Sequence, residues 1–303
     1  MAKVFVSGAT GFVGKNLLRY LKGRALNSEK LNLREPMLSS VFDDAVGGTI
    51  VHLAGKAHDL KKKAITDEYF DVNFELTKQL FDLFLASDAS KFVFVSSVKA
   101  VADKVEGPLT ENHIPAPTTD YGKSKLMAEQ YILAQSLPPG KALYILRPCM
   151  IHGPGNKGNL NLLYKLISKG IPYPLAAFEN KRSFLSVENL CFVIRELLER
   201  DDIPSGIYNV ADDETLSTND LIKLIAEAAE KKPKLWKTNP GLIRTLAKLG
   251  DIFKLPLNTE RLNKLTENYI VDNSKIKNAL GKEFPVQARE GIIKTIKSFQ
   301  KAI

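Results

Sequence analysis

The sequence predicts an α/β fold built on a doubly wound parallel sheet, and three observations support this. Short apolar runs alternate with amphipathic helical segments through the first half of the chain, the order expected of parallel strands joined by helices. The apolar runs are continuous, as in strands covered on both faces. At roughly 150 residues per domain the 303 residues allow two domains, and the pattern changes after Pro148.

The first half is expected to supply the sheet and the helices that cover it. In the longest expected helix Phe70, Leu76, Leu80 and Phe84 recur near helical spacing. The expected strands are 4–6, 31–33, 49–53, 92–95 and 142–146, and the expected helices are 12–22, 68–87 and 120–136.

The second half is expected to be mostly helical, with one returning strand at 206–210. Gly153-Pro154-Gly155 marks a loop, and Ser217 with Asp220 predicts a capping box. The prolines and glycines between 231 and 260 predict broken helix and loop. Helices are expected at 159–168, 188–199, 217–229 and near 286–301.

Composition excludes several classes of protein. The chain is 44% hydrophobic and 25% charged, as in globular proteins, and no apolar stretch approaches the ~18 residues of a membrane span. Lys3 runs directly into a strand, so no signal peptide is expected. Cys149 and Cys191 cannot form a disulfide framework, which favours a cytoplasmic location. The four histidines lack ligand spacing, so no metal site is expected.

The net charge of +9 is unevenly distributed. Residues 231–303 hold 16 Lys/Arg and 6 Asp/Glu, whereas residues 1–230 hold 27 and 28. Such a basic segment suits an anionic partner, namely a diphosphate, an acidic lipid or nucleic acid. We favour solvated lysine-rich helices as the simpler interpretation. No nucleic-acid motif or aromatic stacking run accompanies the charge, so nucleic acid is not an expected partner.

Three glycines, Gly8, Gly11 and Gly14, lie between the first expected strand and the first expected helix. In such a turn the first glycine permits a tight bend, the second admits a pyrophosphate, and the third lets helix pack on strand. Free N–H groups at the helix start face the anion. The GxxGxxG spacing departs from the GxGxxG fingerprint, but its strand–turn–helix context favours a dinucleotide site over a plain loop.

A serine, a tyrosine and a lysine form the candidate catalytic group. Tyr121 and Lys125 are four residues apart, so they share one face of a helix. A lysine ammonium and an oxidised nicotinamide favour the phenolate, so Lys125 is expected to lower the pKa of Tyr121 and make it a proton shuttle. Ser97, at a strand end, can bond the same substrate oxygen. The alternative is a surface tyrosine and lysine on an ordinary helix.

Together these motifs resemble the extended short-chain dehydrogenases/reductases, the branch of nucleotide-sugar epimerases, dehydratases and reductases. The resemblance covers nearly the whole chain and implies a Rossmann-type domain with a smaller C-terminal substrate-binding subdomain. It implies an NAD(P)-binding domain at 1–150 plus about 183–210, and a substrate part at 151–182 and 211–303. The residues that carry it are Gly8-Ala9-Thr10-Gly11-Phe12-Val13-Gly14, His52-Leu53-Ala54-Gly55, Asn73, Ser96-Ser97, Tyr121-Gly122-Lys123-Ser124-Lys125, Arg147-Pro148, Gly153-Pro154-Gly155 and Arg182–Leu190.

The resemblance also implies residue roles. Ser97, Tyr121 and Lys125 would be catalytic, with Lys125 also holding the nicotinamide ribose. Arg182 would meet the nucleotide diphosphate, for which a planar guanidinium is suited. The residues implied in cofactor binding are Gly8, Gly11, Phe12, Val13, Gly14, Leu53, Ala54, Gly55, Lys56, Asn73 and Pro148.

Departures from the family pattern narrow the expectation. Val98-Lys99 stands where sugar 4,6-dehydratases carry an Asp-Glu pair, so dehydration is not expected. The chain is more similar to 4-ketoreductases and 4-epimerases of UDP-linked N-acetylated or deoxy sugars, in which Lys99 could reach substrate or remain a solvated loop lysine. Arg34 could meet a 2′-phosphate while Glu29 and Glu35 argue against one, and we favour NADP over NAD.

The function predicted is hydride transfer at C4 of a nucleotide-activated sugar. The alternatives are NADPH-dependent reduction of a non-sugar carbonyl and a non-catalytic NAD(P) sensor, because fold alone does not imply chemistry. A homodimer through the helices at 68–87 and 120–136 is expected from the family.

Residues 240–255 carry an apolar stripe at helical spacing. Four basic residues accompany it, namely Lys237 just before the segment and Arg244, Lys248 and Lys254 within it. The segment could lie weakly on an anionic membrane surface, or close the substrate pocket with its lysines in solvent. We favour the second hypothesis, because Gly241 and Gly250 are expected to interrupt the helix.

Overall fold

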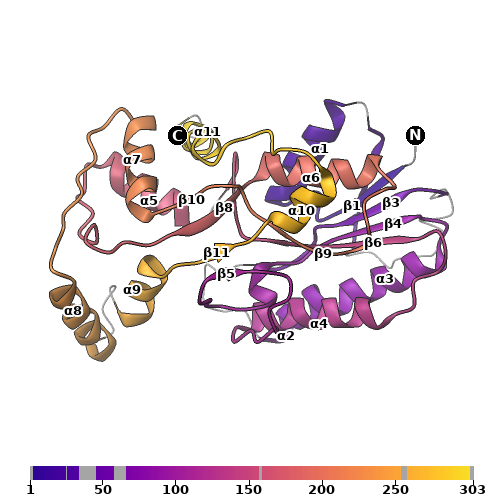
Figure 1. Ribbon diagram of the computed structural model, residues 1–303, viewed down its shortest axis with the longest axis horizontal. Coiled ribbons are helices and arrows are strands. Elements are labelled where there is room, and N and C mark those ends of the chain that lie inside the picture. Colours follow the sequence, from indigo (N-terminus) through magenta and orange to yellow (C-terminus); the bar gives the residue numbers. More distant parts are fainter. Residues whose placement is uncertain are drawn as a thin grey trace.

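The computed structural model of the chain is elongated, with the large sheet toward one end and a group of helices toward the other (Figure 1). It describes residues 3–24, 26–33, 46–57, 66–156, 159–253 and 258–300. None of the described helices is long and apolar enough to cross a membrane.

A six-stranded parallel sheet forms the first layer, which confirms the predicted fold class. Strand β1 pairs with both β2 and β3, so the chain reverses its direction of winding between β1 and β3. Ligands of doubly wound sheets bind at the carboxyl ends of strands beside such a switch point. The order is β2 (Ser28–Leu31), β1 (Val4–Ser7), β3 (Thr49–His52), β4 (Lys91–Val95), β6 (Ala142–Pro148) and β9 (Gly206–Val210).

Successive strand residues point to opposite faces, and helices cover both (Figure 1). Val4 and Val6 pack with the helices α1 (Phe12–Lys22), α6 (Val187–Glu199) and α10 (Ser274–Leu280). Phe5, between them, packs with α3 (Leu76–Ala86) and α4 (Asp120–Ala134) on the other face. Burial on both faces explains why the strands are continuous apolar runs.

The expected helix at 68–87 consists of three consecutive segments. They are α2 (Thr66–Phe70), a π-helical stretch (Asp71–Glu75) and α3. The π turn carries Asn73, which is fully buried. Widened turns of this kind are frequent at functional sites because they reorient one side chain within a helix.

The remaining elements form a second layer around small sheets. The strands β7 (Met150–His152), β8 (Arg182–Ser186) and β10 (Thr215–Leu216) form one sheet, and β5 (Pro108–Leu109) pairs with β11 (Ile270–Val271). A separate apolar core lies among α5 (Asn159–Ser168), α7 (Thr218–Ala228) and α11 (Ala288–Gln300). The predicted capping box of Ser217 and Asp220 opens α7.

Two local predictions are wrong. The strand expected at 31–33 is β2, which ends at Leu31. The broken segment expected at 231–260 contains one continuous helix, α8 (Pro240–Phe253), followed by α9 (Thr259–Thr266). Asn239 explains the helix start, because its side-chain oxygen accepts a hydrogen bond from the N–H of Gly241 at 2.7 Å. Pro240 then occupies the first helical position, where proline is tolerated.

Candidate active site

The glycine turn joins β1 to α1 and meets the segment that follows β3. Gly8 has φ +66°, and a Cβ there would lie 2.6 Å from the backbone nitrogen of Ala54, so only glycine fits. A Cβ on Gly14 would overlap the carbonyl oxygen of Gly8. The predicted cofactor residues after β1 and β3 are therefore in direct contact at the switch point of the sheet.

The first turn of α1 suits an anion. Gly11 is the N-cap residue, no described side chain caps the helix, and its first turn, which begins Phe12-Val13, carries no acidic residue. The helix dipole and the terminal N–H groups favour negative charge at this place. Asn16 donates a hydrogen bond to the carbonyl of Pro154 at 3.0 Å, which fixes the 153–155 loop against α1.

A buried histidine supports the loop after β3. The Ser7 hydroxyl accepts hydrogen bonds from the N–H groups of Leu53 and Ala54, and lies 2.6 Å from Nδ1 of His52. Nε2 of His52 lies 2.8 Å from the hydroxyl of Thr77, which itself donates to the carbonyl of Asn73. These roles assign the proton to Nε2. Burial, with a smaller effect of Lys125, lowers the pKa of His52 to about 3.

Asn73 connects the cofactor loop to the catalytic helix. Its side-chain oxygen accepts from the N–H of Lys56 at 2.8 Å, and its amide donates to the Lys56 carbonyl and to the hydroxyl of Ser124. A Cβ on Gly55 would lie 3.0 Å both from Asn73 and from Nζ of Lys125. The structure thus brings together the predicted cofactor residues Gly55, Lys56 and Asn73 and the predicted catalytic lysine.

Tyr121 lies in the first turn of α4, where the Thr119 hydroxyl caps the helix by accepting from Gly122. The Ser97 side chain lies near its hydroxyl and stabilises the phenolate form. Burial raises the pKa of Tyr121 above its usual value of 10, the nearby Ser97 hydroxyl lowers it, and Tyr69 raises it further. In the protein alone burial therefore outweighs the lowering effect of Ser97 on this pKa, and a lowered pKa beside Lys125 and an oxidised nicotinamide stays a prediction.

Lys125 is buried and points at the end of β4. Its Nζ donates to the carbonyl of Val95 at 3.1 Å. Burial lowers the pKa of Lys125 to about 8, while the carboxylate of Glu129 acts in the opposite direction. Glu129 accepts hydrogen bonds from Arg147 and, at 2.5 Å, from Ser96. Sequence reasoning missed Glu129, although its position continues the four-residue spacing of Tyr121 and Lys125.

The two predicted substrate residues, Lys99 and Arg182, both contact Tyr269. The ammonium of Lys99 lies 4.2 Å from the centre of the Tyr269 ring and donates to the carbonyl of Asp103. Arg182 forms a backbone bridge with Tyr269, and burial lowers the pKa of Arg182 while Glu267 and Tyr269 raise it. The Tyr269 hydroxyl donates to the carbonyl of Ala102 at 2.7 Å. Tyr269 was not expected, because no motif marks it.

Two predicted cofactor residues remain, Pro148 and Arg34. Pro148 ends β6 and is mostly buried, and Arg34 lies outside the described residues. Burial raises the pKa of the nearby Cys149 thiol well above its usual value, so this thiol stays protonated. Among the described residues no cluster of His, Cys, Asp or Glu could hold a metal ion.

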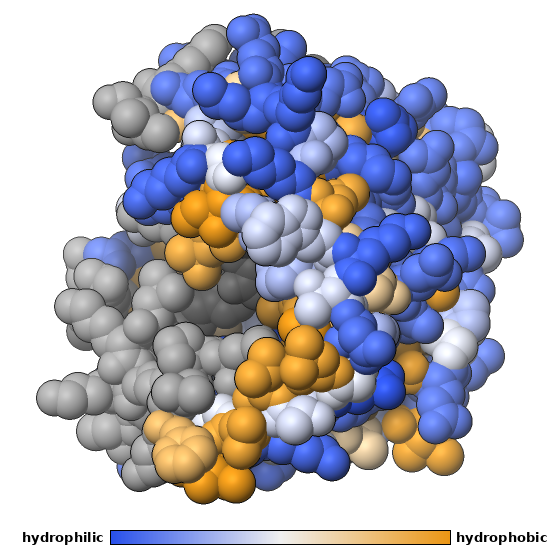
Figure 2. Space-filling model, turned by 90° about the vertical axis from the view of Figure 1, so that its left-hand side faces the viewer, coloured by the Kyte–Doolittle hydropathy of each residue, from blue (hydrophilic) through white to orange (hydrophobic). Residues whose placement is uncertain are grey.

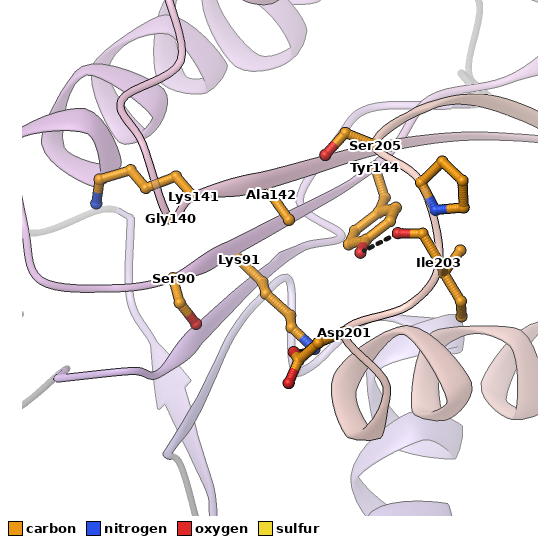
Figure 3. A pocket seen from close by; sticks show the side chains of 10 residues that line it. Ser90, Lys91, Gly140, Lys141, Ala142, Tyr144, Asp201, Ile203 and Ser205 are labelled. Carbon is orange, nitrogen blue, oxygen red and sulfur yellow. Dashed lines mark hydrogen bonds and ion pairs between the residues drawn. The ribbon is translucent and has the colours of Figure 1, made fainter.

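A cavity of about 390 Å³ lies at the opposite, amino-terminal edge of the sheet (Figure 3). Lys91 and Lys141 line it, but both ammonium groups are already engaged. Lys91 donates to the carbonyls of Leu197 and Arg200 at the end of α6, and Lys141 to those of Phe84 and Ser87 at the end of α3. The lysines therefore cap helix C-termini, and this cavity is not part of the candidate site.

Comparisons with known proteins agree with this geometry. A sequence model of the NAD dependent epimerase/dehydratase family matches residues 4–211. The UDP-glucose 4-epimerase of Vibrio cholerae is 30% identical over 325 residues, which cover 99% of this chain and 96% of that protein. The N-acetyl-alpha-D-glucosaminyl-diphospho-ditrans,octacis-undecaprenol 4-epimerase of Escherichia coli O157:H7 is 29% identical over 245 residues, which cover 76% and 73%. The fold is similar to that of RMD from Pseudomonas aeruginosa complexed with NADPH, with a TM-score of 0.73, 20% identity and full coverage of both chains.

Proposed function

The chain belongs to the NAD-dependent epimerase/dehydratase family of extended short-chain dehydrogenases/reductases, and from this premise we propose that it acts at C4 of a nucleotide-activated sugar. The proposed substrate is UDP-linked and N-acetylated or 6-deoxygenated. The reaction is epimerisation or reduction of a 4-keto sugar. The observation that carries the proposal is that Tyr121 and Lys125 share one helix, with Ser97 near the Tyr121 hydroxyl and Lys125 beside Gly55 of the cofactor loop.

The residues present fit a dinucleotide. The pyrophosphate would lie on the uncapped first turn of α1, at Gly11, Phe12 and Val13. Leu53 and Ala54 would line the adenosine side, and Lys125 would hold the nicotinamide ribose next to Gly55. The cofactor would supply the hydride acceptor or donor, which no side chain can provide.

We propose NADP rather than NAD as the cofactor, in agreement with the expectation from the sequence. Glu29, one of two acidic residues that argue for NAD, pairs with Lys3 at 2.6 Å. In the parallel register Glu29 lies opposite Phe5, well before the carboxyl end of β2. A ribose-binding carboxylate belongs at that carboxyl end. The position of Glu29 therefore supports NADP by removing a competing ligand.

The proton is proposed to move through Tyr121. When Tyr121 is neutral, its hydroxyl can donate a proton to the O4 oxygen of the sugar, and as phenolate it can accept the proton back. Ser97 is placed to hydrogen-bond the same oxygen, because it already contacts the Tyr121 hydroxyl. Since burial raises the pKa of Tyr121 in the protein alone, the positive charges of Lys125 and a bound nicotinamide are needed for the phenolate.

Arg182 and Lys99 are proposed to hold the diphosphate of the substrate. Both contact Tyr269, Lys99 through its ammonium and Arg182 through its backbone. This arrangement supports a diphosphate over a neutral carbonyl substrate. Together with Ser97 near the Tyr121 hydroxyl, it also supports an enzyme over a non-catalytic sensor.

We further propose that residues 151–182 and 211–303 form the substrate part. The separate core around α5, α7 and α11 supports that division. A homodimer through α3 and α4 is supported by the exposed Met127 and Leu133 on α4.

The proposal is tested with Tyr121→Phe. UDP-N-acetylglucosamine is incubated with the protein and either cofactor, and the C4 epimer is followed by NMR. Separately, oxidation of NADPH is followed with UDP-linked 4-keto sugars. Turnover should fall by about 10²–10⁴ in Tyr121→Phe while cofactor affinity stays near that of wild type.

Tyr69→Phe is the matched control, because it makes the same substitution in a tyrosine whose ring centre lies 6.4 Å from that of Tyr121. It should retain turnover. Full activity of Tyr121→Phe on a substrate that the wild type converts would overturn the mechanism.

A second candidate substrate is a sugar diphosphate carried by a lipid. The relative from Escherichia coli O157:H7 is an epimerase of an undecaprenol-linked diphosphate sugar. Helix α8, which exposes a row of apolar side chains, favours this candidate. Comparison of turnover on UDP-linked and lipid-linked N-acetylglucosamine separates the two.

A further inference from the structure

Helix α8 leaves most of its apolar side chains in solvent. Leu242, Leu246, Leu249 and Phe253 are 42% to 68% exposed, and we call these four residues the α8 face. In Figure 2 orange side chains gather in the lower half of the surface shown, at the height at which α8 lies in Figure 1. Single exposed leucines are ordinary, but a contiguous exposed row marks an interaction surface.

The α8 face has the geometry of a surface helix. At 3.6 residues per turn its four residues fall within about 60° of one another around the helix axis. The helix rests on the protein by a different stripe, formed by Ile243, Ala247 and Gly250, which are buried. Both stripes are therefore apolar, and only one of them is covered.

The surroundings of the α8 face are basic. Arg244 and Lys248 lie on the remaining exposed side of the helix. The acidic residue of α8, Asp251, accepts hydrogen bonds from the N–H and the hydroxyl of Thr259 at the start of α9. The exposed residues just before the helix are also cationic and include Lys231, Lys232, Lys234 and Lys237. The same segment holds Trp236, which is 59% exposed.

We propose that α8 docks on an anionic lipid bilayer, with the α8 face in the interfacial region and the neighbouring cations facing the headgroups. Interfacial helices combine an apolar face with lysine and arginine in this way, and tryptophan favours the membrane–water boundary. Each nearby cation adds attraction to an anionic leaflet. The docking does not depend on the proposed reaction, because it uses none of the catalytic residues.

Charge argues for a bilayer over a second copy of the chain. A two-fold dimer through α8 would place the same patch against itself. The exposed cations of the helix, Arg244 and Lys248, would then lie close to the same cations of the second copy. An anionic membrane complements this charge, whereas a second copy repels it.

The test uses the chain's single tryptophan as a reporter. Full-length protein is mixed with vesicles of phosphatidylglycerol and phosphatidylcholine, some of them brominated on the acyl chains. The emission of Trp236 should shift to shorter wavelength and be quenched by the brominated lipid. The effect should be weak with pure phosphatidylcholine and should fall with salt, as the Debye length shortens from about 10 Å at 0.1 M.

Leu246→Glu should lower vesicle affinity by about tenfold or more, while its circular dichroism and its turnover of a soluble substrate stay unchanged. Leu162→Glu is the matched control, because Leu162 is an exposed leucine on α5, and it should bind as wild type does. An unchanged Trp236 spectrum of wild type with anionic vesicles would overturn the proposal, as would full binding by Leu246→Glu. A change of Leu246→Glu from dimer to monomer in sedimentation would instead show that a second copy covers the face.

Discussion

Acidification should destabilise the protein through one buried side chain, His52. Its imidazole is completely buried, with Nδ1 beside Ser7 and Nε2 beside Thr77. Burial holds its pKa at about 3, against the ordinary 6.5 of the unfolded chain. Below pH 6.5 the unfolded state therefore gains a proton that the folded state does not accept, so stability falls as pH falls.

The size of the effect follows from the two pKa values. One pKa unit corresponds to about 1.4 kcal/mol, so the full loss from His52 approaches about 5 kcal/mol near pH 3. At pH 5 the loss is about 2 kcal/mol, and at pH 7.5 it is close to zero. The window of this effect is thus pH 6.5 down to 3, and neutral solutions retain the full stability.

His52→Asn removes the titrating group while keeping a polar side chain. We expect the variant to be less stable at pH 7.5, because Thr77 loses a buried partner at a cost of about 1–3 kcal/mol. Urea unfolding at pH 7.5 and pH 5 gives the free energy of unfolding of both proteins. Wild type should lose about 2 kcal/mol more than the variant between these pH values. Equal losses in the two proteins would refute the argument, since all other titrating groups are shared.

Two further changes probe the active site. Arg182→Ala should weaken UDP binding in calorimetry and leave NAD(P) binding unchanged, because we propose that Arg182, which pairs with Tyr269, holds the diphosphate of the substrate. Unchanged UDP affinity would reject this assignment. Glu129→Gln should cost about 3–5 kcal/mol of stability in urea, because it leaves the buried Arg147 without its carboxylate. It should also move the alkaline limb of the pH–rate profile to lower pH, since Glu129 raises the pKa of Lys125. An alkaline limb at the same pH would contradict this electrostatic effect of Glu129 on Lys125.

Sequence patterns predicted the large sheet and its helices because burial on both faces leaves a strong signal. The strands β1, β3, β4 and β6 each have a continuous apolar centre that is buried, and each matches its expected position closely. Strand β2 is an exception, because its sequence Ser-Glu-Lys-Leu lies at the sheet edge with mostly solvated side chains. The small sheet could not be predicted, since β10 has two residues and β7 has three, too few to show a period.

Helix α8 was mispredicted because proline and glycine were taken as breaks. Pro240 stands at the helix start, where its missing N–H costs nothing, and Asn239 caps that turn. Gly250 is buried, and a small residue there lets the helix lie close to its support. Proline and glycine are tolerated in α8 because of their positions in the helix, and the composition of the segment does not reveal those positions.

The candidate site also contains residues that sequence spacing predicts and residues that it does not. The spacing of Tyr121 and Lys125 predicted one helix face, because four residues make about one turn. The residues that hold this face in place come from distant segments and follow no spacing. His52 acts through hydroxyl groups on β1 and α3, and Glu129 meets Arg147 from β6.

Tyr269 shows how the second half of the chain reaches the catalytic loop. Its hydroxyl donates to the carbonyl of Ala102, and its ring supports the ammonium of Lys99, both on the loop that follows Ser97. Its backbone pairs with Arg182 at the start of β8. One buried side chain therefore connects the start of β8 to the loop that follows Ser97.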